Sequence, residues 1–171
     1  QSSRALVVKL KLMTRIVFLL FLFAVVFSSC SKDEESNLPS KHVCLEIDLN
    51  SWDKELKSDY SYKMFNARTV EGRPNPACGL FGFGFGGVIV VRGGEGEFSA
   101  LDLACPYEAR SDVSLRVSDD KTRLVCDACK SEFELIGMAG RLVKGPAKYN
   151  MTNYFVFPVS EGKYSVINLN N

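Results

Sequence analysis

Three cysteines near the middle of the chain are the residues best suited to do chemistry. Cys105 lies in the segment Ala-Cys-Pro-Tyr-Glu, whereas Cys126 and Cys129 share a later Cys-Asp-Ala-Cys segment. Thiolates bind zinc and iron–sulfur clusters, and two thiols close in space form a disulfide. The sequence therefore predicts two short loops that bring three sulfur atoms into one site.

The two cysteine loops and their flanks resemble the Rieske [2Fe–2S] domain, whose cluster loops have the patterns C-x-H and C-x-x-H-G-S-x-F. The likeness runs from about Gly87 to Asn168. It includes Gly145-Pro146-Ala147, which resembles the family's loop that closes over the cluster. Rieske-like lipoproteins of Bacteroidetes, with a C-P-Y-E first loop and a C-x-x-C second loop, resemble the chain more closely still. The resemblance implies a Rieske-like β fold for this part of the chain.

The chain departs from that family at the ligand positions. A Rieske centre uses two cysteines on one iron and two histidines on the other. Cys105 and Cys126 match the two cysteine positions. Tyr107 and Cys129 occupy the two histidine positions. The single histidine of the chain, His42, lies outside both loops and is interpreted as a solvated residue beside the polar N-terminal linker described below. A cluster with the usual two histidine ligands is therefore excluded.

Three interpretations of the thiols remain. The first, which we favour, is a structural disulfide from Cys105 to Cys126 or Cys129, because extracytoplasmic thiols oxidise and the resemblance places these sulfurs around a common iron. The second is zinc or iron held by the three thiolates, with Glu108, Tyr107 or water as the fourth ligand. The third is a [2Fe–2S] cluster with three cysteine ligands. No cofactor is expected under the first interpretation.

Two further cysteines lie outside these loops. Cys44 falls in an early predicted strand, and Cys78 falls in a Pro- and Gly-containing segment. We expect them to pair as a second disulfide between that strand and a loop. Catalysis is less expected than binding, because one histidine leaves no Ser-His or Cys-His pair beside a supporting group. If the domain is redox-active, we expect an electron carrier.

The residues that position these loops have the pattern of β-strands. Val43, Leu45, Ile47 and Leu49 are apolar at every second position, which is typical of a strand with one buried face. Short apolar runs separated by turn residues continue along the chain, and no helical stripe follows Cys30. The other predicted strands are Gly87–Val91, Phe98–Leu103, Val113–Val117, Arg123–Val125, Phe133–Ile136, Tyr154–Val159 and Tyr164–Ile167. The fold class is therefore all-β, as an antiparallel sandwich or small barrel.

One glycine motif requires a separate interpretation. Gly82, Gly84 and Gly87 satisfy G-x-G-x-x-G, the pattern that binds dinucleotides between a strand and a helix. Here the glycines lead into the apolar run of residues 88–91, which is a predicted strand and not a helix. The sequence therefore favours an aromatic-rich loop or edge strand at this point.

The N-terminus has the pattern of a lipoprotein signal peptide. Lys9, Lys11 and Arg15 precede the apolar run Ile16–Phe27, which is short for a membrane span. Ser-Ser-Cys follows and resembles the lipobox of bacterial lipoproteins, which makes Cys30 the expected acylated residue. We predict upstream residues and signal peptide over 1–29, a lipidated tether over 30–40 and the β domain over 41–171.

The acidic tether Ser31–Asn37 resembles the surface-export signal of Bacteroidetes lipoproteins. The sequence thus indicates an outer-membrane protein held by its lipid, on the periplasmic face or the cell surface, with an envelope protein as its expected partner. The net charge is +1 and the chain has no long basic run, so we expect no binding to nucleic acid, which needs many Lys and Arg contacts to phosphates. The favoured function is a structural or binding module, and the alternative is electron transfer at the three cysteines.

Overall fold

The computed structural model describes residue 15 and residues 37–137 and 139–168 of the chain. The apolar run of the predicted signal peptide and Cys30 lie outside the described residues. Among the residues that are described, no helix is long and apolar enough to span a membrane. The described residues from 37 onward belong to one compact unit.

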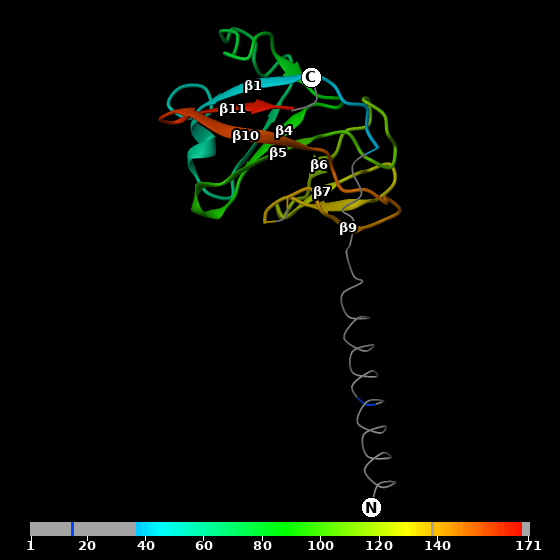
Figure 1. Ribbon diagram of the computed structural model, residues 1–171. Helices are drawn as coiled ribbons and strands as arrows, with labels where there is room; N and C mark the ends of the chain where they lie inside the picture. Colours follow the sequence, from blue (N-terminus) through cyan, green and yellow to red (C-terminus); the bar gives the residue numbers. More distant parts are fainter. Residues whose placement is uncertain (1–14, 16–36, 138, 169–171) are drawn as a thin grey trace, which may run out of the picture. The chain divides into compact units, whose positions relative to one another are not determined.

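A seven-stranded antiparallel sheet forms the larger part of this unit, in the spatial order β2-β4-β5-β10-β11-β1-β3. Figure 1 shows β10 and β11 crossing the middle of this sheet beside β5 and β1. Two short 3₁₀ helices, η1 (Lys54–Lys57) and η2 (Gly94–Gly96), lie in the connections. The strands are β1 (Val43–Asp48), β2 (Tyr62–Phe65), β3 (Gly82–Phe83), β4 (Val88–Arg92), β5 (Phe98–Asp102), β10 (Asn153–Ser160) and β11 (Lys163–Ile167).

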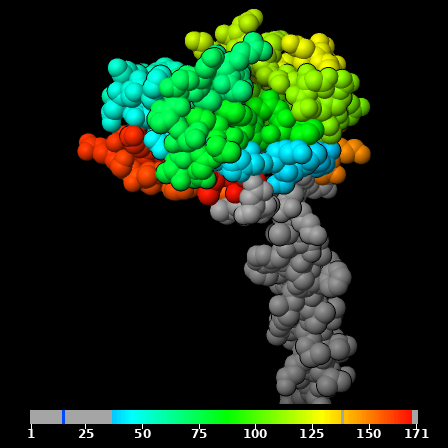
Figure 2. All heavy atoms as spheres, turned by 90° about the horizontal axis from the view of Figure 1, so that it is seen from above, coloured from blue at the N-terminus to red at the C-terminus, as the bar shows by residue number. Residues whose placement is uncertain are grey.

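A four-stranded antiparallel sheet, in the order β6-β7-β8-β9, forms the smaller part. It is inserted between β5 and β10, so it contains the second cysteine loop and follows the first. Its strands are β6 (Arg116–Val117), β7 (Arg123–Val125), β8 (Glu132–Glu134) and β9 (Leu142–Lys144). Figure 2 shows the yellow-green residues of this segment gathered on one side of the domain, away from the red C-terminal hairpin.

The larger sheet wraps around its own core. The alternating residues Val43, Leu45 and Ile47 of β1 are fully buried, as their period of two predicts. Phe65 of β2 packs into the same hydrophobic cluster, although β2 and β1 lie near opposite ends of the strand order. One cluster receives side chains from both ends of the sheet, so the sheet must curl into a nearly closed barrel.

Strands β4 and β5 are buried on both of their faces. Val88 and Val90 contribute to the core of the larger sheet, whereas Ile89 and Val91 contribute to a second core beneath the smaller sheet. Two buried faces explain why residues 88–91 form a continuous apolar run instead of an alternating pattern. This second core also contains Cys105 and Cys126, so the cysteine loops are anchored in the core beneath the smaller sheet.

The antiparallel all-β architecture confirms the predicted fold class, and each predicted strand overlaps an observed strand. The predicted strand Val113–Val117 was too long, because only its last two residues form β6 and Ser114 makes an isolated bridge to Ala104. Strands β2 and β9 were not predicted. The glycine-rich segment contributes β3, an edge strand that pairs with β1.

The glycine motif serves a buried carboxylate and not a nucleotide. Asp102, at the end of β5, is fully buried and accepts hydrogen bonds from the backbone N–H groups of Phe85, Gly86 and Ala104 at 2.6, 2.9 and 2.8 Å. It also accepts the Tyr154 hydroxyl at 2.5 Å. Burial and the adjacent carboxylate raise the pKa of Tyr154. Asp102 thereby fixes the backbone directly before the first cysteine loop.

A disulfide joins Cys44 of β1 to Cys78, the pairing expected from the sequence. The irregular segment that carries Cys78 is also held by an ion pair, in which the Arg73 guanidinium donates to both oxygens of Asp53 at 2.9 and 3.0 Å. Asp53 is fully buried and also contacts the Lys63 ammonium at 2.9 Å. These contacts fix a long connection that has little regular structure.

Candidate metal centre

The first cysteine loop is a tight turn that follows β5. The Ala109 N–H donates to the carbonyl of Cys105, four residues earlier, at 2.9 Å. Ala109 has a φ of 49°, a left-handed conformation that side chains other than glycine seldom adopt. The Cys105 N–H in turn donates to the Val113 carbonyl at 3.3 Å. The loop therefore presents the Cys105 side chain from a closed and hydrogen-bonded backbone.

The second cysteine loop, between β7 and β8, closes in the same way. The Lys130 N–H donates to the carbonyl of Cys126, again four residues earlier and again at 2.9 Å, and Lys130 has a φ of 64°. The Cys126 N–H donates to the Ser131 carbonyl at 2.9 Å, which continues the hairpin pairing into the loop. The two loops therefore share one backbone conformation, with Cys105 and Cys126 at equivalent positions.

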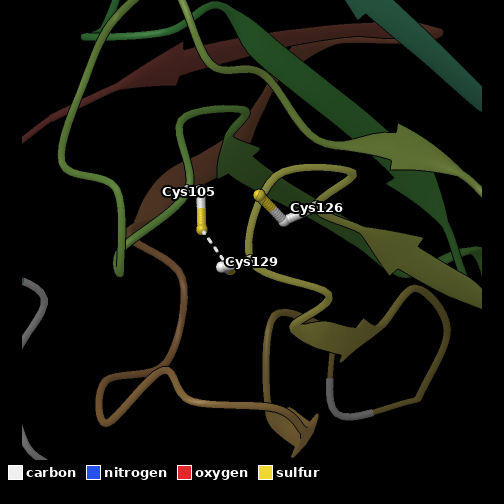
Figure 3. Close-up of side chains that lie close together, drawn as sticks. All are labelled: Cys105, Cys126 and Cys129. Atoms are coloured by element: carbon white, nitrogen blue, oxygen red, sulfur yellow. Dashed lines mark hydrogen bonds between the residues drawn. The ribbon is translucent and has the colours of Figure 1, made fainter.

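The three sulfur atoms meet between these loops. The Sγ atoms of Cys105, Cys126 and Cys129 all lie within 4.8 Å of one another, and those of Cys105 and Cys129 are 3.6 Å apart. Figure 3 shows the three side chains converging from the two loops. All three are free thiols in the structure; Cys105 and Cys126 are buried, and Cys129 is half-buried. The predicted gathering of the three cysteines is thus present, and no disulfide joins them in this structure.

The thiols of Cys105 and Cys129 have different acidities. Burial raises the pKa of Cys105 to about 12, against the opposing effect of the Glu108 and Tyr107 backbone N–H groups that point at its sulfur. Burial also acts to raise the pKa of Cys129, but hydrogen bonds with the hydroxyl and backbone N–H of Ser131 and with the other two thiols together lower it. Cys129 is therefore the thiol of this pair that ionises more readily.

Ser131 connects the cysteines to the Gly145-Pro146-Ala147 loop. The Cys129 thiol donates to Ser131 Oγ at 3.1 Å, and the Ala147 N–H donates to the same oxygen at 3.1 Å. Gly145 has a φ of 106°, and a Cβ on it would lie 2.4 Å from the Ser131 Cα, so only glycine fits. The sequence analysis did not predict a role for Ser131. Its place two residues after Cys129, at the serine position of the C-x-x-H-G-S-x-F pattern, could have indicated one.

The two residues predicted as a fourth ligand are placed differently. Tyr107 is 53% exposed, whereas Glu108 is half-buried. The Glu108 carboxylate is not among the described metal-ligating groups that lie within 4.8 Å of one another. Both residues contribute their backbone N–H groups to the Cys105 sulfur. The first loop thus already holds its sulfur with main-chain donors.

The other described candidates, His42, Cys44 and Cys78, do not belong to the cluster. The His42 ring nitrogen Nε2 lies 3.1 Å from the Leu80 carbonyl oxygen, beside the start of β1. Cys44 and Cys78 are bonded to each other in a disulfide, so neither sulfur is a free thiol that could bind a metal. Cys30 lies outside the described residues.

The donor set does not fit the two-histidine [2Fe–2S] cluster that the sequence resemblance implies. That cluster requires two imidazoles on one iron, and the chain has a single histidine, placed elsewhere. The sulfur spacing fits a single ion better. Two thiolates on one tetrahedral zinc, with Zn–S bonds of about 2.3 Å, lie about 3.8 Å apart. The 3.6 Å between Cys105 and Cys129 is close to that edge length.

Comparisons with known proteins were made for the whole chain. No protein-family model matches it, and no curated protein matches it. Among solved structures, the plasma membrane Rieske protein PetC3 from Synechocystis is 22% identical, with 58% of this chain and 92% of that chain covered and a TM-score of 0.39. The ferredoxin of carbazole 1,9a-dioxygenase from Nocardioides aromaticivorans is 14% identical, with 74% of this chain and 98% of that chain covered and a TM-score of 0.41.

Proposed function

We propose that this chain is a lipid-anchored protein of the bacterial outer membrane, whose Rieske-like β domain has lost the histidine-ligated cluster and serves as a structural or binding module. The observation that carries the proposal is the donor set between the two loops. Three thiols converge there, and the positions that correspond to histidine in the Rieske pattern are Tyr107 and Cys129.

The membrane part of the proposal rests on the sequence. A basic N-terminus, a short apolar run and Ser-Ser-Cys make Cys30 the acylated residue, and the polar stretch after it is the tether. A multiply acylated cysteine satisfies the need for more than one hydrophobic chain in firm anchoring. The partner of the module is then another envelope protein. Export across the outer membrane decides whether the domain is displayed on the cell surface or remains on the periplasmic side.

Spectroscopy of the full chain, isolated from membranes in detergent, tests the loss of the cluster. We expect a colourless protein without acid-labile sulfide and without a Rieske-type electron paramagnetic resonance signal, also after incubation with iron and sulfide. A reddish-brown protein with iron and labile sulfide in equal amounts would refute the proposal. It would support electron transfer by a cluster with three cysteine ligands, which is the second candidate because the three sulfurs converge.

The anchoring is tested separately with Cys30→Ala. Acylation needs the Cys30 thiol, so this variant should remain an unprocessed precursor without lipid. Labelling with a fatty-acid analogue and the mass of the mature chain measure both properties. A Cys44→Ala variant, which changes a cysteine of the β domain, is the control and should be labelled like the parent. Lipid labelling of the Cys30→Ala chain would contradict the proposed anchor.

A further inference from the structure

We propose that the two cysteine loops form a mononuclear zinc site, in which Cys105, Cys126 and Cys129 supply three thiolates and Glu108 supplies the fourth ligand. This inference rests on the proposed function, because it assumes that the loops hold no iron–sulfur cluster. It adds a bound ion and a specific ligand set to a domain described so far only as a module.

The spacing of the sulfurs supports a single ion. All three Sγ atoms lie within 4.8 Å of one another, so a single tetrahedral ion between the two loops can contact all of them. Thiolates on two different irons of a cluster are separated by the additional width of the cluster. Among divalent ions, zinc is the one that typically binds in tetrahedral sites rich in sulfur ligands.

The equivalence of the two loops identifies the fourth ligand. In the second loop, the first cysteine is Cys126 and the residue three positions later, Cys129, turns its side chain toward the site. The first loop has the same closing hydrogen bond and the same left-handed residue at its fifth position. Its residue three positions after Cys105 is therefore the counterpart of Cys129, and that residue is Glu108.

Glu108 has the chemistry and the reach for this role. A carboxylate oxygen is an accepted zinc ligand, and a glutamate side chain is longer than that of a cysteine. The carboxylate has to turn inward from its present place to complete the site. Tyr107 is less suitable, because its side chain is 53% exposed and it lies two residues after Cys105, whereas Cys129 lies three residues after Cys126.

Hydrogen-bond donors of the two loops point at two of the three sulfurs. The backbone N–H groups of Tyr107 and Glu108 point at Cys105, and the Ser131 hydroxyl and N–H serve Cys129. Donors of this kind fix ligand orientation and offset the negative charge of a site with three thiolates. Lys130, which is exposed, adds a positive charge next to Cys129 in the chain. The loops thus supply both the ligands and the groups that stabilise their charged forms.

Metal analysis of the full chain, prepared with and without a thiol reductant, tests the site. We expect one zinc ion per chain and no acid-labile sulfide. Replacement by cobalt should give the visible ligand-field bands of a tetrahedral ion and a thiolate-to-cobalt charge-transfer band. Cys129→Ser should weaken that charge-transfer band, because it removes one of the three thiolates.

The fourth ligand is tested by substitution in the first loop. Glu108→Gln should weaken cobalt and zinc binding by at least about 10-fold, since even the loss of a group that only orients a ligand costs about 10- to 100-fold. Tyr107→Phe should bind like the parent. Asp112→Asn is the matched acidic control, because Asp112 pairs with Arg110 and lies outside the turn. Unchanged affinity in Glu108→Gln, or a loss confined to Tyr107→Phe, would overturn the assignment.

Failure of this inference is distinguishable from failure of the proposed function. A chain that binds no zinc with all three thiols reduced, or that is isolated with a disulfide among them, refutes the zinc site and leaves the cluster-free module standing. Iron and labile sulfide in equal amounts, in contrast, would refute both.

Discussion

The six cysteines of this chain include two groups in the β domain that are held in different ways. Cys44 and Cys78 are joined covalently, across 34 positions of sequence, and tie an irregular connection to β1. Cys105, Cys126 and Cys129 are free, although the sulfurs of Cys105 and Cys129 are 3.6 Å apart. The first group acts as a cross-link, whereas the second is brought together by two turns of the backbone.

The difference shows what positions a reactive cluster. The turns that present Cys105 and Cys126 are each closed by their own hydrogen bond. They pack in the core formed by the smaller sheet and by strands β4 and β5. Ligands held in this way are preorganised before any ion arrives, so less of the binding free energy goes into ordering the chain. The disulfide acts mainly on the unfolded chain, whose freedom it restricts.

Breaking the covalent pair should have the largest effect. Replacement of both partners, Cys44→Ala with Cys78→Ala, frees a loop whose closure is worth about 4 kcal/mol in the chain-entropy treatment. We expect the free energy of unfolding, measured by urea titration, to fall by roughly that amount. The parent chain treated with a metal chelator is the control for the other group. An unchanged unfolding midpoint in the double variant would show that this cross-link adds nothing.

Removing the metal should act only on the second group. Free zinc at 100 times its dissociation constant stabilises the folded chain by about 2.7 kcal/mol. A chelator should therefore lower the thermal midpoint and expose the two cysteine loops to proteolysis, while the Cys44–Cys78 bond stays intact. The effect should be reversed by added zinc and should vanish in Cys129→Ser. A chelator effect that persists in Cys129→Ser would place the responsible ion elsewhere.

A smaller effect is expected from Ser131→Ala. The Ala147 N–H would lose its acceptor in a buried place, which costs about 1–3 kcal/mol. The pKa of Cys129 should rise, because the variant also lacks the hydroxyl that lowers it. Urea titration and thiol ionisation, followed by ultraviolet absorbance on chelated protein, measure the two changes. Ser114→Ala is the control, since its hydroxyl is exposed and donates to the Gly86 carbonyl at 3.3 Å.

The smallest perturbation is alkylation of single thiols in the chelated chain. Cys129 is half-buried and its pKa is lowered, whereas Cys105 is fully buried with a pKa of about 12. Iodoacetamide should therefore modify Cys129 first, and this reaction should persist at lower pH than that of an ordinary thiol. Peptide mapping by mass spectrometry gives the order. Prior modification of Cys105 would mean that the loops open before they react.

Periodic strands were predictable from the sequence because their burial is simple. The alternation in β1 and the continuous apolar run of β4 each follow from one or two buried faces. Strands β2 and β9 have no such signal, since most of their residues are only half-buried or exposed. The ion pair between Asp53 and Arg73 joins residues 20 positions apart, and local patterns carry no information on such a contact.

At the site, the motif predicted which side chains gather but not how they are held. The resemblance of the loops brought the three cysteines together, along with the Gly145–Ala147 loop beside them. The shared conformation of the two turns was not predictable, because Ala109 and Lys130 adopt left-handed conformations that their residue types do not favour. The bridging role of Ser131 also depends on a residue from a distant loop.

Strands β4 and β5 form a wall common to both hydrophobic cores, and this has a consequence for how the domain melts. Ile89 faces one core and Val90 the other, so neither core can lose its packing without exposing the strand that the other core needs. The two sheets should therefore unfold together as one cooperative unit. Calorimetry should give a single transition in which the measured enthalpy equals the van't Hoff enthalpy, even though the second cysteine loop and the disulfide belong to different sheets.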